Sequence, residues 1–431
     1  MEATVAVPND DLARCPTRQK LTVLPPVVVL NLFYSGLGII RQLSGTGVRV
    51  VGLSANHEIF GNFTRLCEVR RAPNSQEQPE QLLRFLQDAA PELHGAIIFP
   101  TRDADVLFLD RFRPELEQLY RLPIPSRDVL GRVLDKDTLA KTAMNAGISV
   151  PRTATVTNFT ELMRESQYVG FPCILKPVRS IHWRDGDNWK TVGGRKAFRA
   201  SNINELENHY KRVSQIRSEV LLQEWIPGGT GNLEIWGGYV GSGTDAAAYF
   251  TARKILQSPG EFGTGCVVES EPLPDLLKPS IRLCRALDYE GIAEIEYKRD
   301  PRDGVLKFIE INVRHWDWHE LGRASQINVT WTAYCHLVGR QIEAVYTPTK
   351  RAKWIAEDVV VRHLWECVWQ RGADQQTILH VFAGKRIYGI SDWHDPAPCI
   401  CYSLKTLLPS FTNAAVGKLK RVFNRAVTPH V

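Results

Sequence analysis

Two strand-like segments near residue 300 limit the possible folds of this chain more than any other feature. They read AEIEYKRD (293–300) and LKFIEINVRH (306–315), and the turn sequence PRDG joins them. Proline and glycine between two β-type segments predict an antiparallel hairpin. Because side chains alternate along a strand, Glu294 and Glu296 share one face, as do Glu310 and Asn312 on the partner strand.

Carboxylates that face one another across a hairpin repel, so these acids need a compensating positive charge. Magnesium would supply it, because this ion prefers oxygen ligands from one or two carboxylates together with substrate phosphates. The flanking isoleucines predict that the opposite face of the hairpin is buried; they are Ile292, Ile295, Ile309 and Ile311. The alternative is a solvated sheet on which the acids pair with Lys298, Arg299, Lys307 or Arg314.

The amino-terminal part of the chain has the pattern of a parallel sheet. Residues 27–32 and 48–54 read as buried strands, with a glycine-containing helix, SGLGIIRQL, between them. A further strand, 96–100, ends at the polar residues 101–103, where open α/β sheets bind ligands. A dinucleotide site is disfavoured, because Arg41 replaces the third glycine of that motif and no carboxylate follows the second strand.

Two lysines occupy positions that suit a phosphate group. Asp135 is a candidate cap of the helix in LDKDTLAKTAMNAG, which places Lys136 in the first turn, where the helix dipole disfavours a cation. Such a lysine is tolerated on a surface, and it also fits a lysine aimed at phosphate. Lys176 ends the buried strand FPCILKP and needs a counter-charge, which a nucleotide phosphate would supply.

Two further segments suggest the walls of a site. Residues 178–198 form a long basic stretch with three glycines, and a loop of this length predicts a lid or a binding loop. HWDWH (315–319) places His315 and His319 four residues apart, as in a helical metal pair, but no third ligand or catalytic Glu lies between them. A wall of the substrate pocket is therefore favoured over a zinc site.

Composition and charge restrict the setting in which the chain acts. Of 431 residues, 44% are hydrophobic, and the net charge is +6, which fits a globular protein for anionic small molecules and does not by itself indicate nucleic acid. The nine cysteines include no CxxC pair, as in a reducing compartment. With no signal peptide and no transmembrane run, we expect a cytoplasmic protein. The basic tail, 418–425, reads as a solvated helix end.

The order of these motifs resembles the ATP-grasp superfamily, and within it the D-aspartate ligase-like carboxylate–amine ligases, which share the SGLGIIRQL turn. The resemblance covers residues 25–345 and rests on Lys136, Lys176, the Gln223–Glu224 strand end, Glu296, and Glu310 with Asn312. It implies an α/β ATP-grasp architecture, in which a parallel βαβ domain precedes a two-part α+β ATP-binding domain. The expected units are a flexible segment (1–24), a Rossmann-like pre-ATP-grasp domain (25–125), the ATP-grasp domain (126–345) and an extension of unknown role with a basic tail (346–431).

The resemblance also implies roles for individual residues. Lys136 and Lys176, and less strongly Lys196, would contact the phosphates of ATP beneath a lid at 179–194. Gln223, Glu224, Trp225 and Ile226 would form the hinge that holds adenine and ribose. Glu296, Glu310 and Asn312 would ligate Mg²⁺, or Mn²⁺ in its place. Arg314 would face the transferred phosphoryl group or the substrate carboxylate, with added charge from Arg253, although the family's proline before this arginine is Val313 here.

The implied function is an ATP- and magnesium-dependent carboxylate–amine ligase, which forms an amide through an acyl phosphate and releases ADP and phosphate. Its partners would be small, amino-acid-like carboxylate and amine substrates, and a homodimer stays open. A non-catalytic ATP-binding protein and a biotin-dependent type of carboxylase with the same fold are the alternatives. The carboxylase would need a separate carrier, because the chain has no carrier-like lysine motif.

Overall fold

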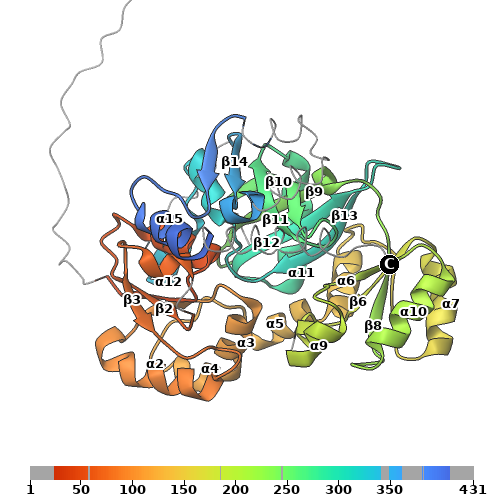
Figure 1. The fold of residues 1–431 in the computed structure, drawn as a ribbon, viewed down its shortest axis with the longest axis horizontal. Helices are drawn as coiled ribbons and strands as arrows, with labels where there is room; N and C mark the ends of the chain where they lie inside the picture. The colour runs from red at the N-terminus through yellow and green to blue at the C-terminus, as the bar shows by residue number, and fades with distance from the viewer. Residues whose placement is uncertain are drawn as a thin grey trace, which may run out of the picture.

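The computed structural model describes residues 24–56, 59–184, 186–243, 246–340, 349–361, 381 and 383–407. The expected flexible segment, apart from Leu24, and the basic tail lie outside these residues. Figure 1 shows the parallel sheet with its helices at one side, the largest sheet in the middle, and a smaller sheet at the other side. No helix in the described part of the chain is both long and apolar enough to span a membrane.

A four-stranded parallel sheet forms the amino-terminal part, in the order β3-β2-β1-β4. Its strands are β1 (Val27–Leu30), β2 (Val50–Ser54), β3 (Glu68–Arg71) and β4 (Ile97–Phe99), and its helices are α1 (Tyr34–Leu43), α2 (Pro79–Leu93), α3 (Asp103–Arg111) and α4 (Arg113–Leu116). Strands β1, β2 and β4 are buried along their whole length, which explains their continuous apolar runs. The predicted parallel βαβ unit is confirmed.

The two glycines of α1 are required by close packing. A Cβ atom on Gly36 would lie 2.1 Å from the carbonyl oxygen of Asn31, and one on Gly38 would lie 2.6 Å from the ring of His319. The buried Arg41, at the position of the third glycine of a dinucleotide motif, donates to the carbonyl oxygen of Ile390 at 2.6 Å. These residues therefore join α1 to other parts of the fold.

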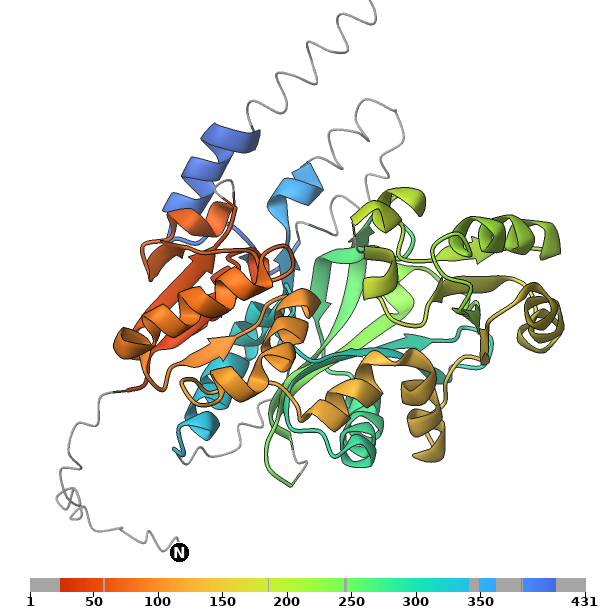
Figure 2. The same cartoon turned by 90° about the horizontal axis from the view of Figure 1, so that it is seen from below.

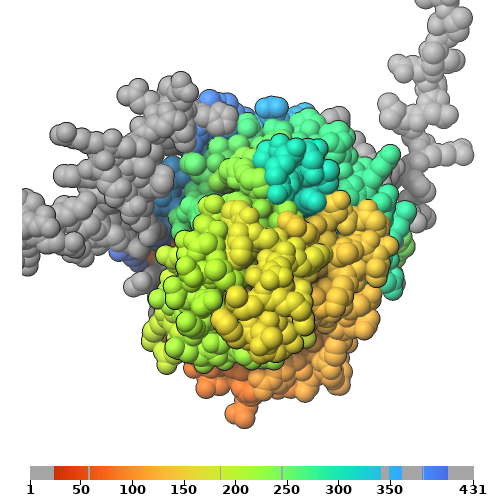
Figure 3. All heavy atoms as spheres, turned by 90° about the vertical axis from the view of Figure 1, so that its right-hand side faces the viewer, coloured from red at the N-terminus to blue at the C-terminus, as the bar shows by residue number. Residues whose placement is uncertain are grey.

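A smaller antiparallel sheet, in the order β5-β8-β6-β7, forms the opposite end of the molecule. Its strands are β5 (Thr153–Val156), β6 (Cys173–Pro177), β7 (Phe198–Ala200) and β8 (Val220–Glu224), covered by α7 (Phe159–Val169) and α10 (Ile203–Val213). Figure 3 shows this end face-on, with its yellow and green residues beside the teal tip of the hairpin. The predicted lid loop contains two short helices, α8 (Ile181–Arg184) and α9 (Gly186–Thr191).

The largest sheet has seven strands in the order β13-β12-β9-β10-β11-β14-β15. They are β9 (Leu233–Val240), β10 (Ala246–Ser258), β11 (Thr264–Ser270), β12 (Gly291–Arg299), β13 (Leu306–Asn312), β14 (Ala352–Ile355) and β15 (Arg386–Tyr388). The remaining helices named here are α5 (Arg127–Leu134), α6 (Lys136–Asn145), α11 (Leu277–Leu287), α12 (Val329–Leu337) and α15 (Ala397–Tyr402).

Strands β12 and β13 form the predicted hairpin, with Glu294 opposite Asn312 and Glu296 opposite Glu310. The burial expected behind the acids is only partly as predicted. Ile295 and Ile311 pair on the buried face, whereas Ile292 alternates with Ala293 and so shares the face of Glu294. A register shift after Glu296 leaves Ile309 unpaired, and its side chain lines the cavity described below.

The described part of the extension is built into the rest of the fold. Strand β14 pairs with β11, so it extends the largest sheet. The hydroxyl of Thr64 donates to Asp395 at 2.6 Å, and the hydroxyl of Tyr34 donates to Asp358. Figures 1 and 2 both show the blue helix α15 beside the red amino-terminal part. The extension therefore joins the amino-terminal part to the largest sheet.

Candidate active site

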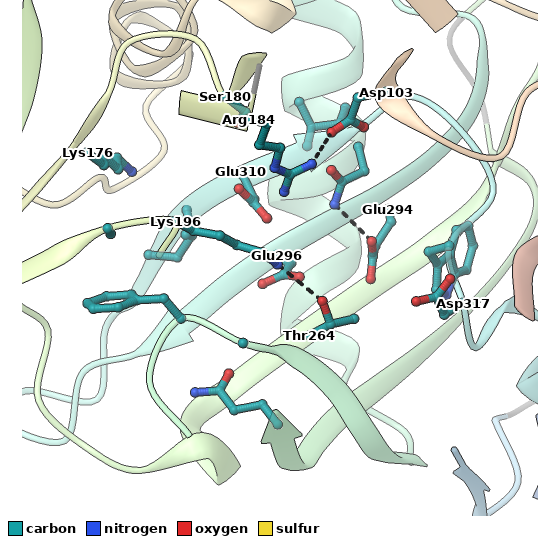
Figure 4. Close-up of a pocket in the computed structure, with 18 of the residues that line it drawn as sticks. Asp103, Lys176, Ser180, Arg184, Lys196, Thr264, Glu294, Glu296, Glu310 and Asp317 are labelled. Carbon is teal, nitrogen blue, oxygen red and sulfur yellow. Dashed lines mark hydrogen bonds and ion pairs between the residues drawn. The ribbon is translucent and has the colours of Figure 1, made fainter. Parts of the chain in front are cut away.

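A cavity of about 970 Å³ lies where the three sheets approach one another. Eleven of the twelve residues singled out from the sequence line it: Lys136, Lys176, Lys196, Gln223, Glu224, Trp225, Ile226, Glu296, Glu310, Asn312 and Arg314. The twelfth, Arg253, lies outside it. Segments separated by nearly two hundred residues in the sequence thus supply one site (Figure 4).

The acids of the hairpin form the floor of the cavity. Asn312 Nδ2 donates to Glu294 Oε2 at 2.9 Å, while the buried Glu294 Oε1 has no hydrogen-bond partner among the described residues. Burial and the nearby Glu296 raise the pKa of Glu294 to about 8. The cluster thus holds more negative charge than this buried surface stabilises by itself.

Four lysines surround Glu310: Lys136, Lys254, Lys196 and Lys176. Burial alone would raise the pKa of the Glu310 carboxyl, but these charges outweigh it, so the pKa is below its ordinary value. Asp135 accepts a hydrogen bond from the Thr138 amide at 2.9 Å and caps α6, as predicted, which fixes Lys136 at the start of the helix. Lys196 Nζ donates to Thr264 Oγ1 at 3.1 Å.

Lys176 has a neutral hydrogen-bond partner where the sequence predicted a need for an anion. Its ammonium donates to Gln223 Oε1 at 2.8 Å. Burial, together with the charge of Lys136, lowers the pKa of Lys176 to about 7. A lysine in this state gains from an arriving phosphate, because a nearby negative charge favours its protonated form.

Nucleotide binding at pH 8 should therefore take up a proton at Lys176. The pKa of this lysine is about 7 before binding, so the group is largely neutral at pH 8 and becomes charged beside a phosphate. At pH 6 it is already protonated, and its uptake should vanish. Calorimetric titration with a non-hydrolysable ATP analogue in two buffers of different ionisation enthalpy measures the uptake. The pH 8 uptake should be lost in Lys176→Met, and equal uptake in that variant would contradict the assignment.

The cation that reaches the hairpin from β10 is Lys254, which the sequence analysis did not select. Lys254 Nζ donates to Glu296 Oε1 at 2.5 Å, and both side chains are buried. Arg253, one residue earlier, points to the other face of β10, where it pairs with Glu234 at 3.3 Å and Glu271 at 3.0 Å. Strand alternation allows only one of two neighbouring residues into the cavity, and the sequence alone did not show which.

The predicted hinge residues follow β8 at the edge of the cavity. The Glu224 carboxylate accepts hydrogen bonds from Arg302 at 2.7 Å and from Arg152 at 3.3 Å, so its side chain is already paired. The Trp225 ring lies between two cations, the Arg199 guanidinium and the Lys298 ammonium, each 4.6 Å from its centre. What the hinge offers a ligand is therefore its main chain and an aromatic surface.

Asp103 connects three elements that the sequence gave no reason to associate. Its carboxylate accepts from Arg314 Nε at 2.7 Å and from Arg184 of α8 at 3.2 Å. Arg314 Nη1 also donates to the carbonyl oxygen of His315 at 3.1 Å. The lid helix, the amino-terminal part and the end of β13 are thus tied together at one carboxylate, and two contacts fix the Arg314 guanidinium.

The HWDWH segment is a wall of the cavity. Trp316, Asp317 and Trp318 line it, whereas His315 and His319 are buried away from it. His315 Nε2 bonds to Thr330 Oγ1 at 2.9 Å, and burial holds the pKa of both histidines below the ordinary value. Within the described ranges, no three His, Cys, Asp or Glu side chains form a metal cluster, so the zinc interpretation has no support.

The residues of the hairpin suit a hard divalent cation. Two carboxylates, Glu296 and Glu310, stand directly opposite each other, and Asn312 keeps its amide oxygen free while its nitrogen binds Glu294. Glu310 makes no hydrogen bond or ion pair with any described residue. Two carboxylates and an amide, open to a cavity, match magnesium, which retains positions for water and phosphate oxygens.

Comparisons with known proteins agree with this geometry. No protein-family model matches the chain. The sequence is 22% identical over 272 residues to D-aspartate ligase from Enterococcus faecium, covering 58% of this chain and 62% of the ligase. It is 23% identical over 284 residues to D-alanine–D-alanine ligase B from Pseudomonas putida, covering 64% and 77%. The biotin carboxylase domain of the 2-oxoglutarate carboxylase from Hydrogenobacter thermophilus, solved with MgADP and bicarbonate, superposes with a TM-score of 0.60 at 16% identity, covering 76% and 72%.

The chain therefore has the ATP-grasp fold, as its sequence motifs predicted. Its sequence resembles the carboxylate–amine ligases of that superfamily, D-aspartate ligase and the D-alanine–D-alanine ligases. The likeness to the carboxylase domain concerns the fold alone. The matched region spans less than two thirds of the D-aspartate ligase, so the specific activity is a separate question.

Proposed function

We propose that this protein is an ATP- and magnesium-dependent carboxylate–amine ligase that works through an acyl phosphate. The observation that carries the proposal is the arrangement of one cavity, with opposed carboxylates on β12 and β13, lysines from three other elements, and a fixed arginine at the end of β13. Phosphoryl transfer needs positioning and electrostatic stabilisation more than covalent chemistry from the protein, and this cavity supplies both.

Each part of the site has a proposed role. Lys136 and Lys176 bind the phosphates of ATP, and the main chain from Glu224 to Ile226 holds the adenine. Glu296, Glu310 and Asn312 hold Mg²⁺, which bridges the terminal phosphates and screens their charge when bound. The free edge of Arg314 stabilises the charge that develops as the substrate carboxylate attacks the terminal phosphoryl group.

An acyl phosphate survives only if water is kept away until the amine arrives. Helices α8 and α9 are placed for this purpose, since Trp183, Arg184 and Trp189 line the cavity. The ion pair of Arg184 with Asp103 holds α8 against the amino-terminal part. We propose that this contact keeps the lid closed during the reaction.

Incubation with MgATP and a mixed pool of L- and D-amino acids should release ADP and phosphate, together with an amide product detectable by mass spectrometry. AMP and pyrophosphate as products would contradict the proposal. ADP release that depends on bicarbonate and not on amino acids would favour a carboxylase. Nucleotide binding without ADP above the blank, with any acid–amine mixture, would favour the non-catalytic alternative.

A further inference from the structure

The cavity has an end away from Lys176 that the proposed ATP and magnesium contacts do not use. It is lined by Ser35, Thr101, Asp103, Trp316, Asp317 and Trp318. Figure 4 shows Asp317 on the other side of Glu294 from Lys176, with Glu310 and Glu296 between them. A substrate that reaches from the phosphates past the hairpin acids would meet these residues.

Asp317 is a carboxylate without a cation. Its Oδ1 accepts a hydrogen bond from the Ser35 hydroxyl at 2.9 Å, and it forms no ion pair with any residue that the structure describes. The nearby cations have other partners, since Arg314 binds Asp103 at 2.7 Å and Lys254 binds Glu296 at 2.5 Å. Burial raises the pKa of Asp317, as expected for an acid that lacks a counter-charge.

The surroundings of Asp317 strengthen any pair that it forms. Its neighbours Trp316 and Trp318 are 1% and 3% exposed, so bulk water has little access from behind the wall. Charge-assisted hydrogen bonds are stronger in such a setting than in water. Arg314 lies three residues earlier, close enough for each side chain to shift the pKa of the other. The same wall therefore presents one cationic and one anionic group.

We infer that Asp317 is a specificity-determining residue that binds the ammonium group of the acid substrate, while Arg314 faces its carboxylate. The two side chains would hold a zwitterion by its two charges, so an amino acid would be preferred to the same acid without its amino group. This inference rests on the proposed function and refines it, because it assigns the ammonium to the carboxylate-bearing substrate and not to the attacking amine.

A simpler role for Asp317 would be to join two parts of the fold through Ser35, at the start of α1. Two variants separate the roles. Asp317→Asn removes the charge but retains an oxygen that accepts the Ser35 hydrogen bond. Ser35→Ala removes that hydrogen bond but retains the carboxylate. A purely structural role would make Ser35→Ala the more harmful change, whereas ammonium binding would be lost only in Asp317→Asn.

The test uses the full chain, MgATP labelled in the β–γ bridging oxygen, and matched acids without an added amine. The pairs are D- or L-alanine against propionate, and D- or L-aspartate against succinate. Exchange of the label with the wild type should favour the amino acid of a pair. Asp317→Asn should lower its kcat/KM by about 10- to 100-fold, the range for losing a charged hydrogen-bond partner, and reduce the preference. Ser35→Ala should keep the preference.

Equal exchange with both acids of every pair would overturn the inference and leave the proposed ligase in place. An unchanged preference in Asp317→Asn, or a loss of preference shared equally with Ser35→Ala, would also overturn it. If no acid supported exchange in the wild type, the proposed function itself would fail, and the inference would fail with it.

Discussion

Glu310→Gln should lower turnover by on the order of 10²- to 10³-fold, the loss expected when one group that stabilises transition-state charge is removed. Glu310 stands opposite Glu296, and no described residue donates a hydrogen bond or forms an ion pair to its carboxylate. Its charge is therefore free for a ligand. The loss should be partly recovered at high magnesium, because the variant weakens the metal site without removing Glu296.

The same variant should fold as well as the wild type or slightly better. Like charges directly opposite each other destabilise a sheet, and glutamine removes one of them at nearly the same size. Thermal unfolding and steady-state ADP release measure the two effects in parallel. Glu115→Gln, the same change on an exposed part of α4, is the matched control and should alter neither. Full activity of Glu310→Gln at limiting magnesium would show that the hairpin is not the metal site.

Arg314→Lys should lower kcat by on the order of 10²-fold, the lower end of the range for one electrostatic group. The arginine uses Nε for Asp103 and Nη1 for His315, so its fixed plane leaves one edge for the substrate. A lysine has a single ammonium and cannot keep the Asp103 contact while also presenting a planar fork.

Arg253→Lys is the matched control for this variant. Arg253 lies on the same sheet but outside the cavity, where it pairs with Glu234 and Glu271. It should retain most of its turnover and lose some thermal stability, since these contacts are structural. If Arg253→Lys lost turnover as strongly as Arg314→Lys, the role of Arg253 implied by the family resemblance would be correct and its placement here would not explain function.

Local patterns predicted much of the fold and the cavity lining, because the relevant signals lie within short stretches of sequence. Strand alternation placed Glu294 and Glu296 on one face, and the cap at Asp135 placed Lys136. The order of motifs then identified the ATP-grasp fold, which the comparisons agree with.

What the sequence could not show depends on contacts between distant segments. Asp103 meets Arg314 across 211 positions, and no local pattern specifies that pair. The choice of Lys254 over Arg253 depends on the register of β10, which its partner strands fix. Asp317 read as part of a wall, and its lack of a counter-charge became visible only when its surroundings were known.

Positional isotope exchange tests the central claim most directly. ATP labelled in the β–γ bridging oxygen is incubated with the protein, magnesium and the acid substrate, without the amine. If the carboxylate attacks the terminal phosphoryl group, bound ADP rotates before the step reverses, and label should enter the non-bridging β positions. The scrambling should require both the acid and magnesium, and Arg314→Lys should reduce it strongly. Release of pyrophosphate, or exchange that appears only when the amine is added, would contradict the acyl phosphate mechanism.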